Sequence, residues 1–86
     1  MTREAILAIV VKHVAEAVEG LSVAAVDPAL AMTDHGLSSL DIVDVVSRSQ
    51  QVLQVAVPRA ELRKARTINR FVDLLHQATL ARVTKE

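Results

Sequence analysis

The sequence predicts an all-α protein, a small four-helix bundle with three longer helices, a short third helix and a long loop between the first two helices. Apolar residues recur at helical spacing in several segments. Only two glycines and two prolines interrupt the 86 residues, which favours a helical fold over a sandwich with many turns. The hydrophobic fraction of 51% is almost wholly aliphatic, with Phe71 as the single aromatic residue. Because this length suits one core, we expect residues 1–86 to form a single domain.

The first helix is expected to begin after Thr2, which can serve as its N-cap, and to end at Gly20. Its apolar stripe recurs at steps of four and three residues, the spacing of an amphipathic helix. The stripe consists of Leu7, Val11, Val14, Val18 and Leu21.

The helical pattern is lost over residues 22–38. Asp27-Pro28 forces a turn, because proline restricts the residue before it and cannot continue a helix. We expect four apolar side chains to anchor this connection to the core, namely Val23, Val26, Leu30 and Leu37. A loop this long in so small a domain is usually functional, so the start of the next helix is the place to look for a site.

The second helix is expected to start at Ser38 and Ser39. Ser38 with Asp41 three residues later approximates a capping box, with aspartate in place of the usual glutamate or glutamine. Val57-Pro58 ends the segment. Its apolar residues are Ile42, Val43, Val45, Val46 and Leu53.

The third helix is expected to be short, over residues 59–66, with Pro58 at its start. Thr67 is the expected cap of the last helix. The apolar stripe of that helix follows the 3.6-residue period through Ile68, Phe71, Val72, Leu75 and Thr79.

Catalysis and metal binding by this chain are not expected. The sequence has no cysteine, so it offers no disulfide, no thiolate metal site and no cysteine nucleophile. The only imidazoles are His13, His35 and His76, and none has a neighbour at metal-ligand spacing. No glycine-rich phosphate loop is present, and nothing supplies a serine with an orienting acid or an oxyanion hole. We therefore predict that the chain is not an enzyme.

The longest apolar run, from Ala5 to Val11, has seven residues. This is too short to span a bilayer, and no cleavable signal pattern follows it. We expect a cytoplasmic protein without a membrane partner.

Ser39 falls at the first position of the second helix, where backbone amides are unpaired and the helix dipole is positive. Gly36 lets the chain bend just before it. A phosphate on this hydroxyl is favoured by the amides and the dipole together. The dipole contributes only about 0.3–1 kcal/mol and cannot activate the serine, so any modifying enzyme must come from outside. Spacing alone leaves two readings open, a modified Ser39 or two serines that only cap the helix.

The stretch Val26-Asp27-Pro28-Ala29-Leu30, followed by Asp34-His35-Gly36-Leu37-Ser38-Ser39-Leu40-Asp41, resembles the phosphopantetheine-attachment region of acyl carrier proteins. That family typically reads Gly-x-Asp-Ser-Leu-Asp/Glu at this point, after a long loop. Further along, Val57-Pro58 and Thr67-Ile68 fall where the family has Ile-Pro and Thr-Val. The similarity extends from the first helix to about Leu80.

The resemblance implies that Ser39 receives 4′-phosphopantetheine from coenzyme A, transferred by a separate phosphopantetheinyl transferase. The arm would then hold acyl groups as thioesters. Further partners would be an acyl-loading enzyme or acyltransferase and a ketosynthase or other pathway enzymes, and the chain is expected to be a monomer. Family members present the helix after the serine to partners, and the matching positions are Leu40, Asp41, Val43, Asp44 and Ser47, with Gln50 and Gln51 further along. Core packing remains an alternative role for Val43.

Three departures from the family pattern suggest a dedicated carrier. Ser38 stands where the family usually has aspartate, and Gln50 and Gln51 stand where the fatty-acid branch commonly has carboxylates. The net charge is zero, whereas carriers of fatty-acid synthesis are generally strongly acidic. We infer a carrier of polyketide or related specialised biosynthesis, with a fatty-acid or an aminoacyl or peptidyl carrier as alternatives.

Although the net charge is zero, the two halves of the sequence carry opposite net charges. Residues 1–45 hold seven acidic and two basic residues, net −5, and residues 46–86 hold eight basic and three acidic residues, net +5. The basic half contains Arg59, Arg63, Arg66 and Arg70 at helical steps, a stripe that could track nucleic-acid phosphates. The zero net charge and a helix break at Thr67 argue against such a nucleic-acid-binding module. A plain helical interaction module with unmodified Ser39 is a third possibility.

Overall fold

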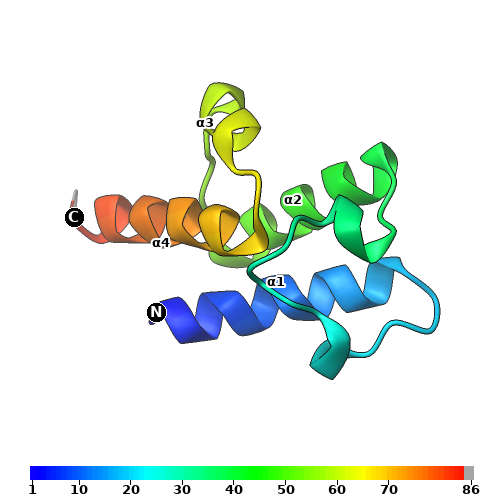
Figure 1. Cartoon of the computed structure of the whole chain (residues 1–86). Coiled ribbons are helices and arrows are strands. Elements are labelled where there is room, and N and C mark those ends of the chain that lie inside the picture. Colours follow the sequence, from blue (N-terminus) through cyan, green and yellow to red (C-terminus); the bar gives the residue numbers. More distant parts are fainter. Residues whose placement is uncertain (85–86) are drawn as a thin grey trace.

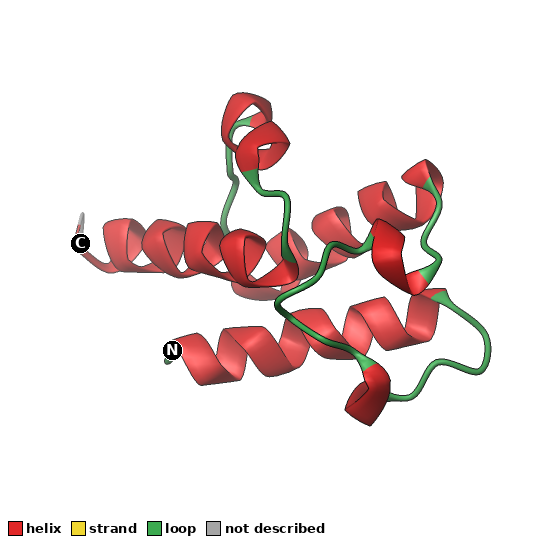
Figure 2. Ribbon diagram, viewed as in Figure 1, coloured by secondary structure: helices red, strands yellow, loops and turns green. Residues whose placement is uncertain are grey.

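The computed structural model describes residues 1–84 and the side chains of residues 1–81, and this part of the chain is all-helical (Figures 1 and 2). It contains four α-helices, which are α1 (Arg3–Ala17), α2 (Ser39–Leu53), α3 (Arg59–Lys64) and α4 (Ile68–Thr84). Two single turns of 3-10 helix lie in the long loop, η1 (Val23–Ala25) and η2 (Thr33–His35). The predicted helical bundle with a short third helix is confirmed.

The core lies between α1, α2 and α4, which all contact one another. Figure 1 shows α1 and α4 running in opposite directions, so that the N-terminus of α1 and the C-terminal end of α4 lie at the same end of the molecule. Each buried aliphatic or aromatic side chain contributes on the order of 1.5–3 kcal/mol. The largest fully buried hydrophobic side chains are Ile6, Val10, Val14, Val45, Ile68, Phe71, Val72 and Leu75.

The start of α1 was predicted, but its end and part of its buried face were not. The Ala5 amide donates to the Thr2 hydroxyl (3.2 Å), which confirms the N-cap. The helix ends at Ala17, before Gly20, because the backbone of Val18 is extended. Its buried residues are Ile6, Val10, Val11 and Val14, whereas Leu7, Val18 and Leu21 are only partly buried.

The long loop packs against the start of α4. The Asn69 amide donates to the Pro28 carbonyl (2.9 Å), and the Ile68 amide donates to the Leu30 carbonyl (3.0 Å). These bonds satisfy amides that a helix cannot pair internally at its N-terminus. The loop therefore has a fixed position relative to α4.

Two of the four predicted loop anchors are correct and two are wrong. Val26 and Leu37 are buried, but Val23 and Leu30 are exposed. Leu30 is tied to α4 through its backbone carbonyl rather than its side chain. Met32, which was not predicted, is the third loop side chain in the core.

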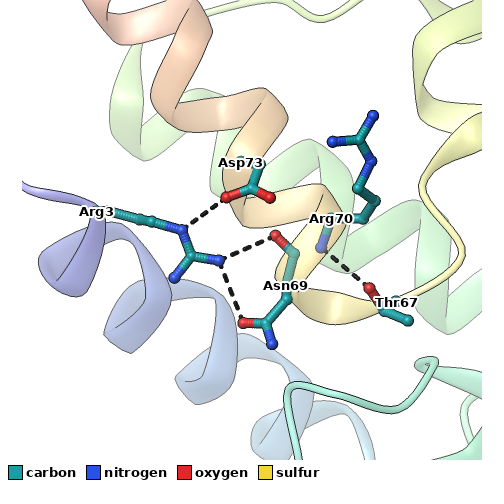
Figure 3. A network of polar contacts seen from close by, with 5 residues as sticks. All are labelled: Arg3, Thr67, Asn69, Arg70 and Asp73. Atoms are coloured by element: carbon teal, nitrogen blue, oxygen red, sulfur yellow. Dashed lines mark hydrogen bonds and ion pairs between the residues drawn. The ribbon is translucent and has the colours of Figure 1, made fainter.

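A polar cluster joins the beginnings of α1 and α4 (Figure 3). Arg3 Nε donates to Asp73 Oδ1 (2.7 Å), and Arg3 Nη2 donates to the backbone and side-chain oxygens of Asn69 (3.3 Å each). Nearby, the Arg70 amide donates to the Thr67 hydroxyl (3.1 Å), as expected of a residue that caps α4.

The short helix α3 stands apart from α2. It contacts α4, but none of its Cα atoms lies within 8 Å of a Cα atom of α2. Figure 1 shows it projecting away from the other helices. It ends at Lys64, two residues earlier than predicted, with Ala65 outside helical backbone geometry.

Candidate functional site

Ser39 is the first residue of α2, and its side chain is exposed. Gly36 ends η2 with φ +91°, a left-handed conformation that glycine adopts without steric cost. This bend turns the chain from the loop into α2. Within the described residues, the Ser39 hydroxyl makes no hydrogen bond.

The predicted capping box at Ser38 is confirmed. The Asp41 amide donates to the Ser38 hydroxyl (3.2 Å), and the Ser38 amide donates to Asp41 Oδ2 (2.9 Å). These reciprocal bonds define the start of α2 and occupy the Ser38 side chain. They leave the amides of Ser39 and Leu40 without a hydrogen-bond partner in the described structure. The two adjacent serines therefore differ: one is engaged in the cap and the other is free.

His35 holds together the loop that leads to α2, a role that the sequence did not indicate. The Asp27 amide donates to His35 Nε2 (2.9 Å), so that nitrogen is an acceptor. The proton therefore resides on Nδ1, which donates to the Ala31 carbonyl (2.9 Å). The Ala31 amide donates in turn to Asp34 Oδ2 (3.0 Å). One neutral imidazole thus connects two points of the loop just before Gly36.

The residues expected to recognise partners lie between Leu40 and Ser47 of α2, with Gln50 and Gln51 in its last turn. Leu40 is 82% exposed and Val43 is 62% exposed, so Val43 is not a core residue. Asp44 is exposed and pairs with Arg48 (3.1 Å), whereas Asp41 is engaged in the cap. Ser47 is exposed. Their role in recognition stays a prediction.

A cleft of about 760 Å³ lies between α2 and α3, where the two helices stand apart. Its apolar surface includes Ile42, Val46, Leu62 and Phe71, and Val43 and Ser47 also line it. Ile42 and Val43 are three and four residues after Ser39, which places them on the same side of α2. The sequence did not predict this cleft, because it depends on how far α3 stands from α2.

Among the described residues, the other imidazoles and carboxylates are not grouped as a metal or catalytic site would require. His13 Nδ1 lies 3.0 Å from the hydroxyl of Ser49, which is fully buried on α2, so this pair links α1 to α2. Among the residues described, no group of three or more His, Asp or Glu side chains is placed to hold a metal ion. No helix in residues 1–84 is both long and apolar enough to cross a membrane.

The chain matches the family described as "Phosphopantetheine attachment site" over residues 10–75. It belongs to this family. The match extends from the middle of α1 to α4 and includes the loop, Ser39 and the cleft. No curated protein and no solved structure gives a significant match to the chain.

Phosphopantetheine-attachment proteins carry covalently attached 4′-phosphopantetheine, so this chain is a carrier protein whose cofactor is that group. Carrier domains of this family are generally not catalytic. They interact with the enzymes that modify them and with the enzymes of their pathway. The resemblance found in the sequence is thereby confirmed.

Proposed function

We propose that this protein is an acyl carrier protein, that Ser39 bears the phosphopantetheine arm, and that the chain presents acyl intermediates to partner enzymes. One observation carries the assignment of the site. Ser39 combines an exposed, unbonded hydroxyl with the first position of a helix whose first two amides are free. By contrast, the hydroxyl of the neighbouring Ser38 already accepts a hydrogen bond from the Asp41 amide.

The surroundings of Ser39 suit a phosphodiester but not a self-catalysed reaction. The free amides and the helix dipole favour a phosphate at this end of α2, by about 0.3–1 kcal/mol per charge for the dipole. No side chain in the described part of the chain accepts a hydrogen bond from Ser39, so no general base is engaged with it. A separate phosphopantetheinyl transferase must therefore act on Ser39. When attached, the arm supplies a terminal thiol that holds an acyl group as a thioester.

The absence of cysteine fits this role. Because the sequence has no thiol of its own, no side chain of the protein competes with the arm for acyl groups. We propose accordingly that the chain is not itself an enzyme. It would work as a cytoplasmic monomer, with residues 1–86 as one carrier domain.

The exposed side of α2 beside Ser39 is the proposed docking surface for the transferase, the acyl-loading enzyme or acyltransferase, and a ketosynthase. Leu40 and Val43 offer apolar contact next to the attachment point. Asp41, Asp44 and Ser47 surround them, and charges at the edge of such a surface mainly govern association rate and selectivity.

The pathway is proposed to be polyketide or related specialised biosynthesis. The uncharged Ser38 beside the attachment point and the zero net charge support a dedicated set of partners. Gln50 and Gln51 support it as well, because they stand where the fatty-acid branch commonly has carboxylates. A fatty-acid carrier and an aminoacyl or peptidyl carrier remain the alternatives, and mass spectrometry of the intermediate attached in the native host distinguishes the three.

A nucleic-acid-binding role has little structural support. The proposed arginine stripe needs one continuous helix, but α3 ends at Lys64. Arg66 follows α3, and Arg70 lies on α4. We therefore propose no nucleic-acid partner.

The test is to incubate the protein with coenzyme A and a broad-specificity phosphopantetheinyl transferase and to weigh it intact. The wild-type protein should gain one arm, and Ser39→Ala should gain none. Ser38→Ala is the matched control and should still gain one. Loss of attachment in Ser38→Ala, with Ser39 present and the protein folded, would overturn the assignment of the two serines.

A further inference from the structure

The cleft between α2 and α3 carries an unbalanced positive charge. Arg59 and Arg63 of α3 and Arg66 just after it all line the cleft. None of the three makes an ion pair or a side-chain hydrogen bond within the described part of the chain. By contrast, Arg3 and Arg48 are both paired with carboxylates.

The rest of the cleft does not neutralise these arginines. No aspartate or glutamate from the described residues lines it. The lining also includes apolar side chains of α2, Leu62 of α3 and Phe71 of α4. The cleft therefore combines an apolar surface with three arginines that have no carboxylate partner in the described part of the chain.

This combination does not suit an acyl chain made only of hydrocarbon. Hydrocarbon gains free energy from the apolar surface but nothing from the arginines. A carboxylate beside these arginines is attracted to their positive charge and can accept charge-assisted, bidentate hydrogen bonds from their guanidinium groups. The cleft thus matches a ligand that is apolar along its length and anionic at one end.

We propose that the cleft selects acyl chains that carry a carboxylate at the end remote from the thioester. This inference rests on the proposed function, because it requires the chain to be tethered at Ser39. Ile42 and Val43, one helical turn after Ser39, form the part of the lining nearest to the tether along α2. The apolar segment of the acyl chain contacts α2 and Phe71, and the carboxylate meets the arginines of α3.

The experiment compares two cargoes of equal length on the intact protein. The arm is transferred to Ser39 already loaded, from hexanoyl-coenzyme A or from hexanedioyl-coenzyme A, and loading is verified by intact mass. The rate of thioester cleavage by hydroxylamine is then measured, because a chain held in the cleft shields its thioester from attack. Each cargo is compared across proteins, so differences in the intrinsic reactivity of the two thioesters cancel.

Two variants are compared with the wild type. One is the triple variant Arg59→Gln/Arg63→Gln/Arg66→Gln. The other is the control Arg70→Gln, since Arg70 is exposed on α4 and does not line the cleft.

The proposal predicts that the hexanedioyl thioester is cleaved about three- to fivefold faster on the triple variant than on the wild type, the size of an exposed ion-pair contribution. The Arg70→Gln protein should behave like the wild type. The hexanoyl thioester should be cleaved equally on all three, and circular dichroism of the three proteins shows separately that the variants are folded. The difference should shrink as salt is raised, because exposed ion pairs are screened.

Equal cleavage of the hexanedioyl thioester on the wild type and the triple variant overturns the inference and leaves the carrier function intact. If the triple variant instead changes only the KM of the transferase, the arginines serve an acidic partner surface and the inference is wrong. If the wild-type protein accepts no arm, the carrier assignment of Ser39 fails, and this inference fails with it.

Discussion

At the scale of single residues, the two serines at the start of α2 are chemically alike and structurally different. Ser38 is the N-cap, and its hydroxyl and amide are both bonded to Asp41. Ser39 is one residue further, and its hydroxyl is free. A difference of one position therefore separates a residue that stabilises the fold from a residue that is available for modification.

Replacing Ser38 by alanine should lower the free energy of unfolding by about 1 kcal/mol, because the Asp41 amide loses its acceptor. Urea denaturation followed by circular dichroism measures this loss. Ser38→Asp, which retains a cap acceptor, should restore most of it. Ser47→Ala, an exposed change within α2, should stay within about 0.5 kcal/mol of the wild type. A Ser38→Ala protein as stable as the wild type would show that the capping box contributes nothing.

At the scale of elements, the loop before α2 is ordered by His35 rather than by a continuous apolar pattern. His35 links the Asp27 amide to the Ala31 carbonyl, while Pro28 and Leu30 accept from the first amides of α4. The loop thereby fixes where α2 begins relative to α4.

Replacing His35 by alanine removes both imidazole hydrogen bonds and should loosen the loop without unfolding the helices. Amide hydrogen exchange at Asp27 should speed up by about tenfold, since a hydrogen bond contributes about 1 kcal/mol or a little more. His76→Ala is the matched control, because the His76 side chain makes no hydrogen bond in the described structure. Unchanged exchange at Asp27 in the His35→Ala protein would contradict the role given to this imidazole.

The element α2 also carries the proposed docking surface. Leu40→Ala and Val43→Ala should each raise the KM of the transferase several-fold, because partner contacts of apolar side chains are lost while little core packing changes. Val52→Ala is the matched control, since Val52 is 55% exposed on the same helix but does not line the cleft. Steady-state kinetics of arm transfer measures the effect. Equal KM values for Val43→Ala and Val52→Ala would remove Val43 from the docking surface.

At the scale of the whole molecule, the structure shows why some features could be predicted from the sequence and others could not. The caps at Thr2, Ser38 and Thr67 and the buried stripe of α4 depend on residues a few positions apart, so local patterns reveal them. The exposure of Val23 and Leu30, by contrast, depends on how the loop packs against α1 and α4. The cleft depends on where α3 stands, and local spacing does not contain that information.

The single aromatic residue joins the core to the cleft. Phe71 is 2% exposed, and it also lines the cleft. Phe71→Ala should lower the free energy of unfolding by about 3–5 kcal/mol, a large part of the roughly 5–15 kcal/mol that holds a domain together. Thermal and urea unfolding measure it, with Val52→Ala as the control. A loss under about 1 kcal/mol would show that Phe71 is not central to the core.

The opposite net charges of the two halves of the sequence should affect how the whole molecule meets its partners. The net-negative segment, residues 1–45, includes α1, the loop and the start of α2. The net-positive segment, residues 46–86, includes α3 and α4. Partners that approach the start of α2 with a basic surface should be attracted to the acidic half. The rate of arm transfer at low protein concentration should therefore fall as salt is raised from low to physiological ionic strength. A rate independent of salt would exclude such steering.

The central claim is that Ser39, and not a neighbouring serine, bears the phosphopantetheine arm, and fragmentation of the modified peptide tests it most directly. Trypsin releases residues 13–48 as one peptide that contains Ser22, Ser38, Ser39 and Ser47. Fragment ions from cleavage between Ser38 and Ser39, and between Ser39 and Leu40, should place the whole added mass on Ser39. Fragments that place it on Ser22, Ser38 or Ser47, or a peptide without added mass despite an active transferase, would contradict the claim.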